Sequence, residues 1–92
     1  MELDLHLPQS RSLKAKRAVI KPILEGARRR YLVAAAEVAH QDRCQRAGLG
    51  MAAVSTDAGH VEDVLDKVER FVWSHPEVEV LTAERSWLAS GA

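Results

Sequence analysis

The most restrictive feature of this sequence is the strict alternation at residues 2–7. Every second residue there is leucine, whereas Glu2, Asp4 and His6 occupy the positions between. A period of two is typical of a β-strand with one buried and one polar face. Such a strand belongs in a sheet that is covered on one side only, so the rest of the chain must supply the cover.

Two segments repeat their apolar residues at the helical period and can supply that cover. The first runs from about Leu13 to Tyr31, and Ser12 is its predicted N-cap. The second begins after Asp57, its predicted N-cap, and ends before Pro76. Each has one apolar face, so we expect both helices to pack on the leucine face of the sheet.

Three further segments complete the pattern. Residues 32–40, 47–55 and 77–85 are short, apolar or alternating, and are predicted as strands. The order β-α-β-β-α-β predicts an α+β ferredoxin-like sandwich, in which an antiparallel four-stranded sheet carries two helices on one face and the first and third strands are central. The 92 residues leave room for one domain, which we place at residues 1–88, and we expect residues 89–92 to be a frayed tail.

The net charge of zero conceals an asymmetry between the two halves of the chain. Residues 1–46 have a net charge of +5 and residues 47–92 a net charge of −5. On a helical wheel, four cations of the first helix fall on one flank over a length of about 21 Å, which suits a row of phosphates. The alternative is an ordinary solvated helix face. The four are Lys14, Arg17, Lys21 and Arg28, and Arg43 and Arg46 from the loop between the second and third strands extend the row.

Three stretches carry a resemblance to a known family. They are residues 10–17 (SRSLKAKR), residues 36–42 with 45–47, and residues 54–58 leading into 60–61. Together they resemble the YlxP-like family of small uncharacterised bacterial proteins (domain of unknown function 503). The resemblance implies a ferredoxin-like fold and a cytoplasmic bacterial protein whose relatives are often encoded beside translation and ribosome-maturation genes, but it implies no established activity.

The chain departs from that family in three places. Family members commonly carry an acid at the position of Ala15, a glycine at that of Ala39 and a bulky apolar residue at that of Cys44. The missing acid at Ala15 removes a capping partner for Ser12 and makes the first helix more basic.

The basic row and the resemblance together predict a non-enzymatic binding protein that contacts structured RNA, such as a ribosomal particle. The two central strands contain no aromatic residue, which excludes the base stacking of RRM domains and leaves recognition by shape and charge. The alternative is a structural or regulatory homo-oligomer, such as a homodimer, that associates through the open sheet face or the loop at residues 41–46 without nucleic acid.

A polar cluster follows the second strand and consists of His40, Gln41, Asp42 and Gln45. We expect it to form a hydrogen-bonded turn or to contact a second chain. A small hydrolase that uses His40 and Asp42 is a further alternative, but no second histidine or cysteine stands at a suitable spacing for a metal site.

The remaining expectations concern what the chain lacks. Cys44 is the single cysteine, so we predict no internal disulfide and no cysteine-based zinc cluster. We also expect no other metal site, no catalytic residue and no cofactor. The apolar runs are too short to span a bilayer and the first residues do not resemble a signal peptide. We therefore expect a cytoplasmic protein with neither a membrane partner nor a small-molecule ligand.

Overall fold

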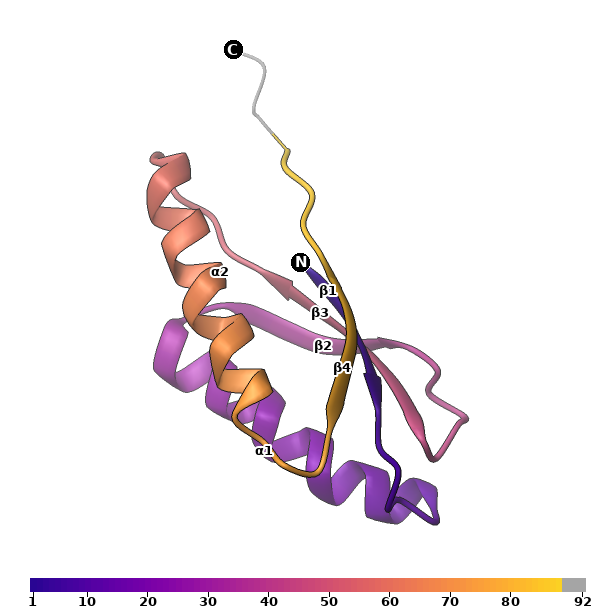
Figure 1. The fold of residues 1–92 in the computed structure, drawn as a ribbon. Helices are drawn as coiled ribbons and strands as arrows, with labels where there is room; N and C mark the ends of the chain where they lie inside the picture. Colours follow the sequence, from indigo (N-terminus) through magenta and orange to yellow (C-terminus); the bar gives the residue numbers. More distant parts are fainter. Residues whose placement is uncertain (89–92) are drawn as a thin grey trace.

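The computed structural model describes residues 1–88 and contains one antiparallel sheet and two helices. The predicted tail at residues 89–92 lies outside the described residues. The elements follow the chain as β1 (Glu2–His6), α1 (Leu13–Tyr31), β2 (Ala34–Ala39), β3 (Arg46–Ala52), α2 (Ala58–Trp73) and β4 (Glu79–Glu84) (Figure 1).

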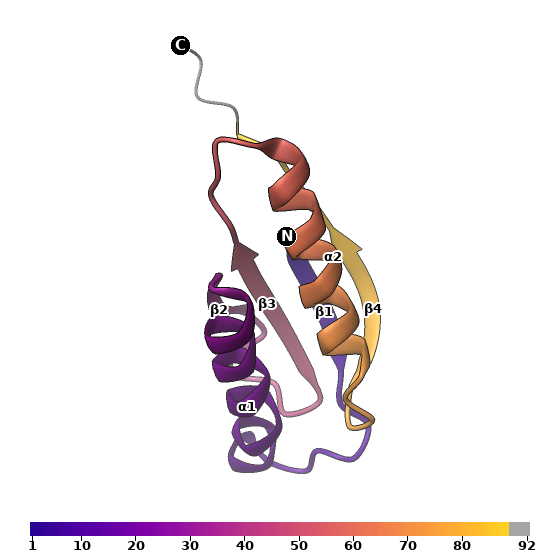
Figure 2. The ribbon, with the colours of Figure 1, turned by 90° about the vertical axis from the view of Figure 1, so that its left-hand side faces the viewer.

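The strand order is β2-β3-β1-β4, and each neighbouring pair is antiparallel. Both helices lie on the same face of the sheet, with α1 on the side of β2 and α2 on the side of β4 (Figure 2). The other face of the sheet is open (Figure 1). The structure thus has the predicted α+β ferredoxin-like layout, with β1 and β3 in the centre.

A single apolar core fills the space between the sheet and the helices. Leu3 and Leu5 of β1 and the following Leu7 are at most 1% exposed. The residues between them, Glu2, Asp4 and His6, point to the open face and are more accessible. The core residues contributed by the helices are Ile20, Ile23, Ala27, Val61, Leu65, Val68 and Val72. The period-of-two pattern therefore predicted correctly which face of β1 is covered.

Both helices begin where their predicted caps stand. The hydroxyl of Ser12 accepts a hydrogen bond from the backbone N–H of Ala15 at 3.0 Å, and a carboxylate oxygen of Asp57 accepts one from Gly59 at 2.9 Å. Each cap satisfies a backbone donor that has no partner inside its helix. Within residues 1–88, neither helix combines the length and the hydropathy needed to cross a membrane.

The second and third strands are shorter than predicted. Leu32 caps the end of α1 in a left-handed conformation with φ 56°, so the chain does not become a strand until Ala34. Ala52, the last residue of β3, pairs with Ala34. Residues 53–55 have no β2 residue to pair with, and the strand ends there.

Candidate functional site

The predicted basic flank of α1 faces away from α2 and follows the sheet edge formed by β2. On the opposite flank, the ring of Phe71 from α2 packs against Gly26 and lies beneath the guanidinium of Arg30, 5.1 Å from it. On the basic flank, Arg28 reaches β2 and donates from Nε and Nη2 to the carbonyl of Ala35. The four predicted cations on this flank are all exposed.

Three of the predicted cations form what we call the basic edge: Lys14, Arg17 and Lys21. All three are exposed. The ammonium of Lys21 lies 3.9 Å from a carboxylate oxygen of Glu25, an exposed pair one helical turn apart that solvent screens strongly. Lys14 and Arg17 make no ion pair with any carboxylate of residues 1–88.

Two of the other predicted cations have structural partners. Arg28 is exposed, but two of its donors are used on the Ala35 carbonyl at the sheet edge. Arg46 turns to the open face, where it forms an ion pair with Asp4. Arg43 is exposed in the loop between β2 and β3. The structure thus leaves the basic edge and Arg43 as the accessible members of the predicted set.

The predicted polar turn is tied to its surroundings mainly through its backbone. The N–H of Arg43 donates to the carbonyl of His40 at 3.0 Å, and the N–H of Leu7 donates to the carbonyl of Gln45 at 2.9 Å. The side chains of Gln41 and Asp42 are exposed. The first of these bonds closes a turn, and the second fastens the loop to the end of β1.

Lys16 is the residue that the sequence reading missed. Its side chain is 2% exposed, and its Nζ lies 2.7 Å from a carboxylate oxygen of Glu37 in β2. The same Nζ donates to the backbone carbonyls of His40, Gln41 and Arg46 at 2.9, 3.2 and 3.3 Å. We call this network, made of Lys16, Glu37 and the three carbonyls, the Lys16 anchor. It fastens the first turns of α1 to the loop between β2 and β3.

A signal for the anchor is present in the sequence. Lys16, Ile20, Ile23 and Ala27 are spaced i, i+4, i+7 and i+11, which is the spacing of one helix face, and all four are buried. A lysine at a core position of an amphipathic helix indicates that a buried carboxylate or a set of backbone carbonyls binds its ammonium group.

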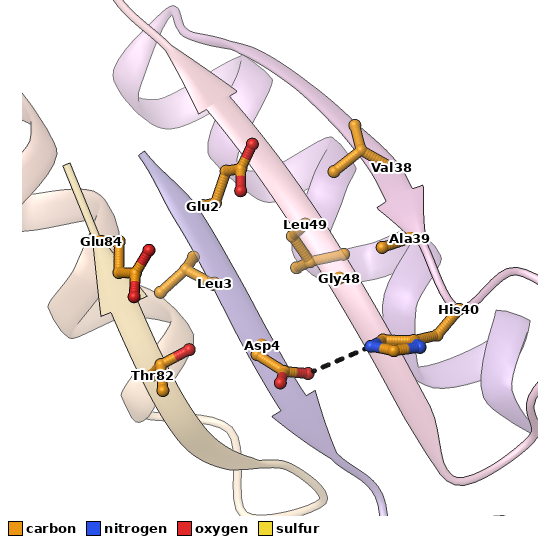
Figure 3. Close-up of a pocket in the computed structure, with 10 residues that line it drawn as sticks. All are labelled: Glu2, Leu3, Asp4, Val38, Ala39, His40, Gly48, Leu49, Thr82 and Glu84. Atoms are coloured by element: carbon orange, nitrogen blue, oxygen red, sulfur yellow. Dashed lines mark ion pairs between the residues drawn. The ribbon is translucent and has the colours of Figure 1, made fainter. Parts of the chain in front are cut away.

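The open sheet face has a different character. This face has a shallow depression of about 240 Å³. Figure 3 shows its lining side chains, with Asp4 and His40 pointing toward each other. Their facing atoms are 3.7 Å apart, so His40 faces Asp4 and not Asp42 as in the hydrolase alternative. Within residues 1–88, no three His, Cys, Asp or Glu side chains are grouped so that they could hold a metal ion.

Acidic side chains predominate where β1 and β4 meet on this face. Glu2 pairs directly with Glu84 in the register of the two strands, next to Asp4. Like charges placed opposite each other in a sheet repel each other. This part of the open face is therefore unsuited to phosphate.

Two cations of the second half of the chain, Lys67 and Arg85, are paired with carboxylates, whereas Arg70 of α2 is exposed and makes no ion pair within residues 1–88. Arg85 lies 2.8 Å from Asp66 and 3.2 Å from Glu69, and Lys67 lies 3.2 Å from Asp63. Burial alone would lower the pKa of Arg85, but the hydrogen bonds and charges of the two carboxylates outweigh it and raise that pKa. The Arg85 pairs join the residue after β4 to α2, and the Lys67–Asp63 pair lies within α2.

Comparison with known proteins places the chain among related sequences. A family model described as "Protein of unknown function (DUF503)" matches residues 1–85, which include all six helices and strands. The chain is also 40% identical over 76 residues to "Uncharacterized protein YlxP" of Bacillus subtilis (strain 168), and the match covers 83% of each of the two chains. The similarity extends over the basic edge, the Lys16 anchor and the open face alike.

Proposed function

The chain belongs to the family described as protein of unknown function DUF503, and we propose that this member is a non-enzymatic protein that binds structured RNA through α1. The contact surface consists of the basic edge together with Arg43. The RNA is ribosomal, in keeping with the genomic setting that the YlxP-like resemblance implies.

The observation that carries this proposal is the accessibility of the basic edge. Lys14 and Lys21 are seven residues apart on one rigid helix, about 10 Å along its axis. Cations held at fixed spacing can neutralise several phosphates at once and release their counterions. A partner with a regular row of phosphates fits this arrangement.

The position of Lys14 adds a second argument. It lies two residues after the N-cap Ser12, and the first turn of α1 contains no acidic residue. A helix N-terminus carries partial positive charge, so a cation there destabilises the helix by a few tenths of a kcal/mol. A charge that costs stability and makes no ion pair is better explained by a partner than by the fold.

The side chains of the sheet favour contact with the RNA backbone over recognition of the RNA bases. Neither β1 nor β3 carries an aromatic residue, and Glu2 and Glu84 make the part of the open face between β1 and β4 acidic. RRM domains stack bases on aromatic residues of the corresponding face. Recognition by this chain therefore depends on phosphates and shape.

The test is a comparison of two charge-matched variants. Lys14→Ala/Arg17→Ala and Lys67→Ala/Arg70→Ala each remove two cations, the first pair from the basic edge and the second from α2. Fluorescence anisotropy with a labelled RNA hairpin should show a loss of affinity of about tenfold for the first and little change for the second. Equal losses would mean that net charge, and not this surface, governs binding.

One observation favours the alternative of a homo-oligomer. Val38 is 49% exposed on β2 beside Gly50 of β3, so an apolar side chain is exposed on the open face next to its acidic part. In a homodimer a second copy would cover this side chain. Light scattering across protein concentration tests it, and a strict monomer at high micromolar concentration would remove it.

A further inference from the structure

The Lys16 anchor spans the whole loop between β2 and β3. An ammonium group has three N–H donors, and those of Lys16 reach carbonyls at both ends of the loop: His40 and Gln41 after β2, and Arg46 at the start of β3. The carboxylate of Glu37 balances the charge from within β2. A single side chain of α1 thus fixes where the loop begins and where it ends.

Stability alone does not explain such an arrangement. Burying an ion pair costs desolvation free energy, and a pair of apolar residues of similar size often stabilises a protein equally well or better. What an apolar pair cannot do is bind three carbonyls and fix the loop that carries them. His40 also adopts a left-handed conformation with φ 60°, which a non-glycine residue holds only when its surroundings impose it.

We infer that Lys16 is a positioning residue for the proposed RNA contact, because it holds the loop that carries Arg43 against the end of α1 that carries Lys14 and Arg17. Lys16 lies between these two cations in the sequence, and Arg43 lies two residues beyond Gln41, whose carbonyl Lys16 binds. The anchor thereby adds an exposed loop cation to the basic edge at a fixed place. This inference rests on the proposed function.

The principal experiment removes the anchor without removing net charge. Lys16→Met/Glu37→Leu deletes one positive and one negative charge and keeps the volume. Lys67→Met/Asp63→Leu makes the same change at an exposed pair on α2 and is the matched control. With an RNA hairpin, the slope of log affinity against log salt should become shallower by about one in the first variant, since one phosphate contact is lost. The control should keep the slope of the unmodified chain.

A mutant cycle shows whether the lost contact belongs to Arg43. In the unmodified chain, Arg43→Ala should also make the slope shallower by about one. In the Lys16→Met/Glu37→Leu background it should change nothing, because Arg43 is no longer held in place. The same loss in both backgrounds would overturn the inference.

A second variant keeps the test valid if the double substitution does not fold. Two glycines inserted after Asp42 leave the anchor residues unchanged but free the exposed loop tip, where insertions are tolerated. The insertion should reproduce the slope of Arg43→Ala. An unchanged slope would contradict the inference.

The results distinguish a failure of the proposed function from a failure of the inference about Lys16. If the unmodified chain shows no salt-dependent affinity for the hairpin, the proposed function is wrong and the inference falls with it. If the unmodified chain binds and the anchor variant binds with the same slope, the proposed function stands and the inference alone is wrong.

Discussion

Lys16 and its neighbours Lys14 and Arg17 are the same kind of residue in opposite surroundings. Lys16 is buried among carbonyls and a carboxylate, whereas Lys14 and Arg17 are exposed and make no ion pair within residues 1–88. Because successive helix residues point about 100° apart, one helical turn places cations both in the core and on the surface. A count of charges therefore says little about which of them a partner can reach.

The same distinction applies to the whole basic half of the chain. Its net charge of +5 includes Lys16, Arg28 and Arg46, whose donors are used within the fold. The basic edge and Arg43 are exposed and form the second group; Arg11, Arg29 and Arg30 are exposed as well but lie outside the proposed contact surface. We expect substitutions in the first group to change stability and substitutions in the second to change binding.

The largest effect is expected at Lys16. Lys16→Met leaves Glu37 buried without its cation and leaves three carbonyls without their donor, which should lower the free energy of unfolding by about 3–5 kcal/mol. Urea denaturation followed by circular dichroism measures it, and Lys14→Met is the matched control. Similar losses in the two variants would show that burial does not separate these lysines.

An intermediate effect is expected at Arg28. Arg28→Ala removes two hydrogen bonds to the Ala35 carbonyl at the sheet edge and should cost about 1–2 kcal/mol. Arg29 is the control, because its side chain is 81% exposed and its nearest carboxylate, Glu25, is 4.0 Å away. Arg29→Ala should change the free energy of unfolding by less than about 0.5 kcal/mol. An equal loss of stability in the two variants would show that the hydrogen bonds of Arg28 do not stabilise the fold.

A smaller effect is expected when both members of the buried pair are replaced. Lys16→Met/Glu37→Leu should lower the free energy of unfolding by about 1 kcal/mol, because the three carbonyls still lose their donor but no buried charge is left unpaired. The same urea titration compares it with Lys16→Met. If the double variant is as unstable as the single one, the lost loop hydrogen bonds, and not the unpaired carboxylate, dominate the cost.

The smallest effect is expected at Lys14, and its sign is opposite. Lys14→Ala should raise the free energy of unfolding by a few tenths of a kcal/mol, because it removes a cation from the positive end of α1. Thermal unfolding at low ionic strength is the suitable measurement. A clear loss of stability would mean that Lys14 serves the fold.

The fold could be predicted because it follows from local patterns. The leucine alternation in β1 and the caps at Ser12 and Asp57 depend on residues close in sequence, and the structure has them as expected. The end of α1 at Tyr31 was predicted correctly, but the start of β2 was placed two residues too early, because Leu32 adopts a left-handed conformation that its residue type does not indicate.

The site was less predictable because it depends on contacts across the sheet. Lys16 bonds to carbonyls 24 to 30 residues away, and Arg46 meets Asp4 from a neighbouring strand. Only the helical spacing of Lys16 with Ile20 and Ile23 indicated its burial. Which partner such a side chain binds can be determined only from the tertiary structure.

The most direct test of the central claim is a salt titration of the unmodified chain with an RNA hairpin. If the three cations of the basic edge and Arg43 each neutralise one phosphate, log affinity should fall against log salt with a slope of about −3 to −4. The slope should approach zero in the variant that replaces all four with alanine. A flat response in the unmodified chain, or a steep one that persists in this variant, would contradict the account.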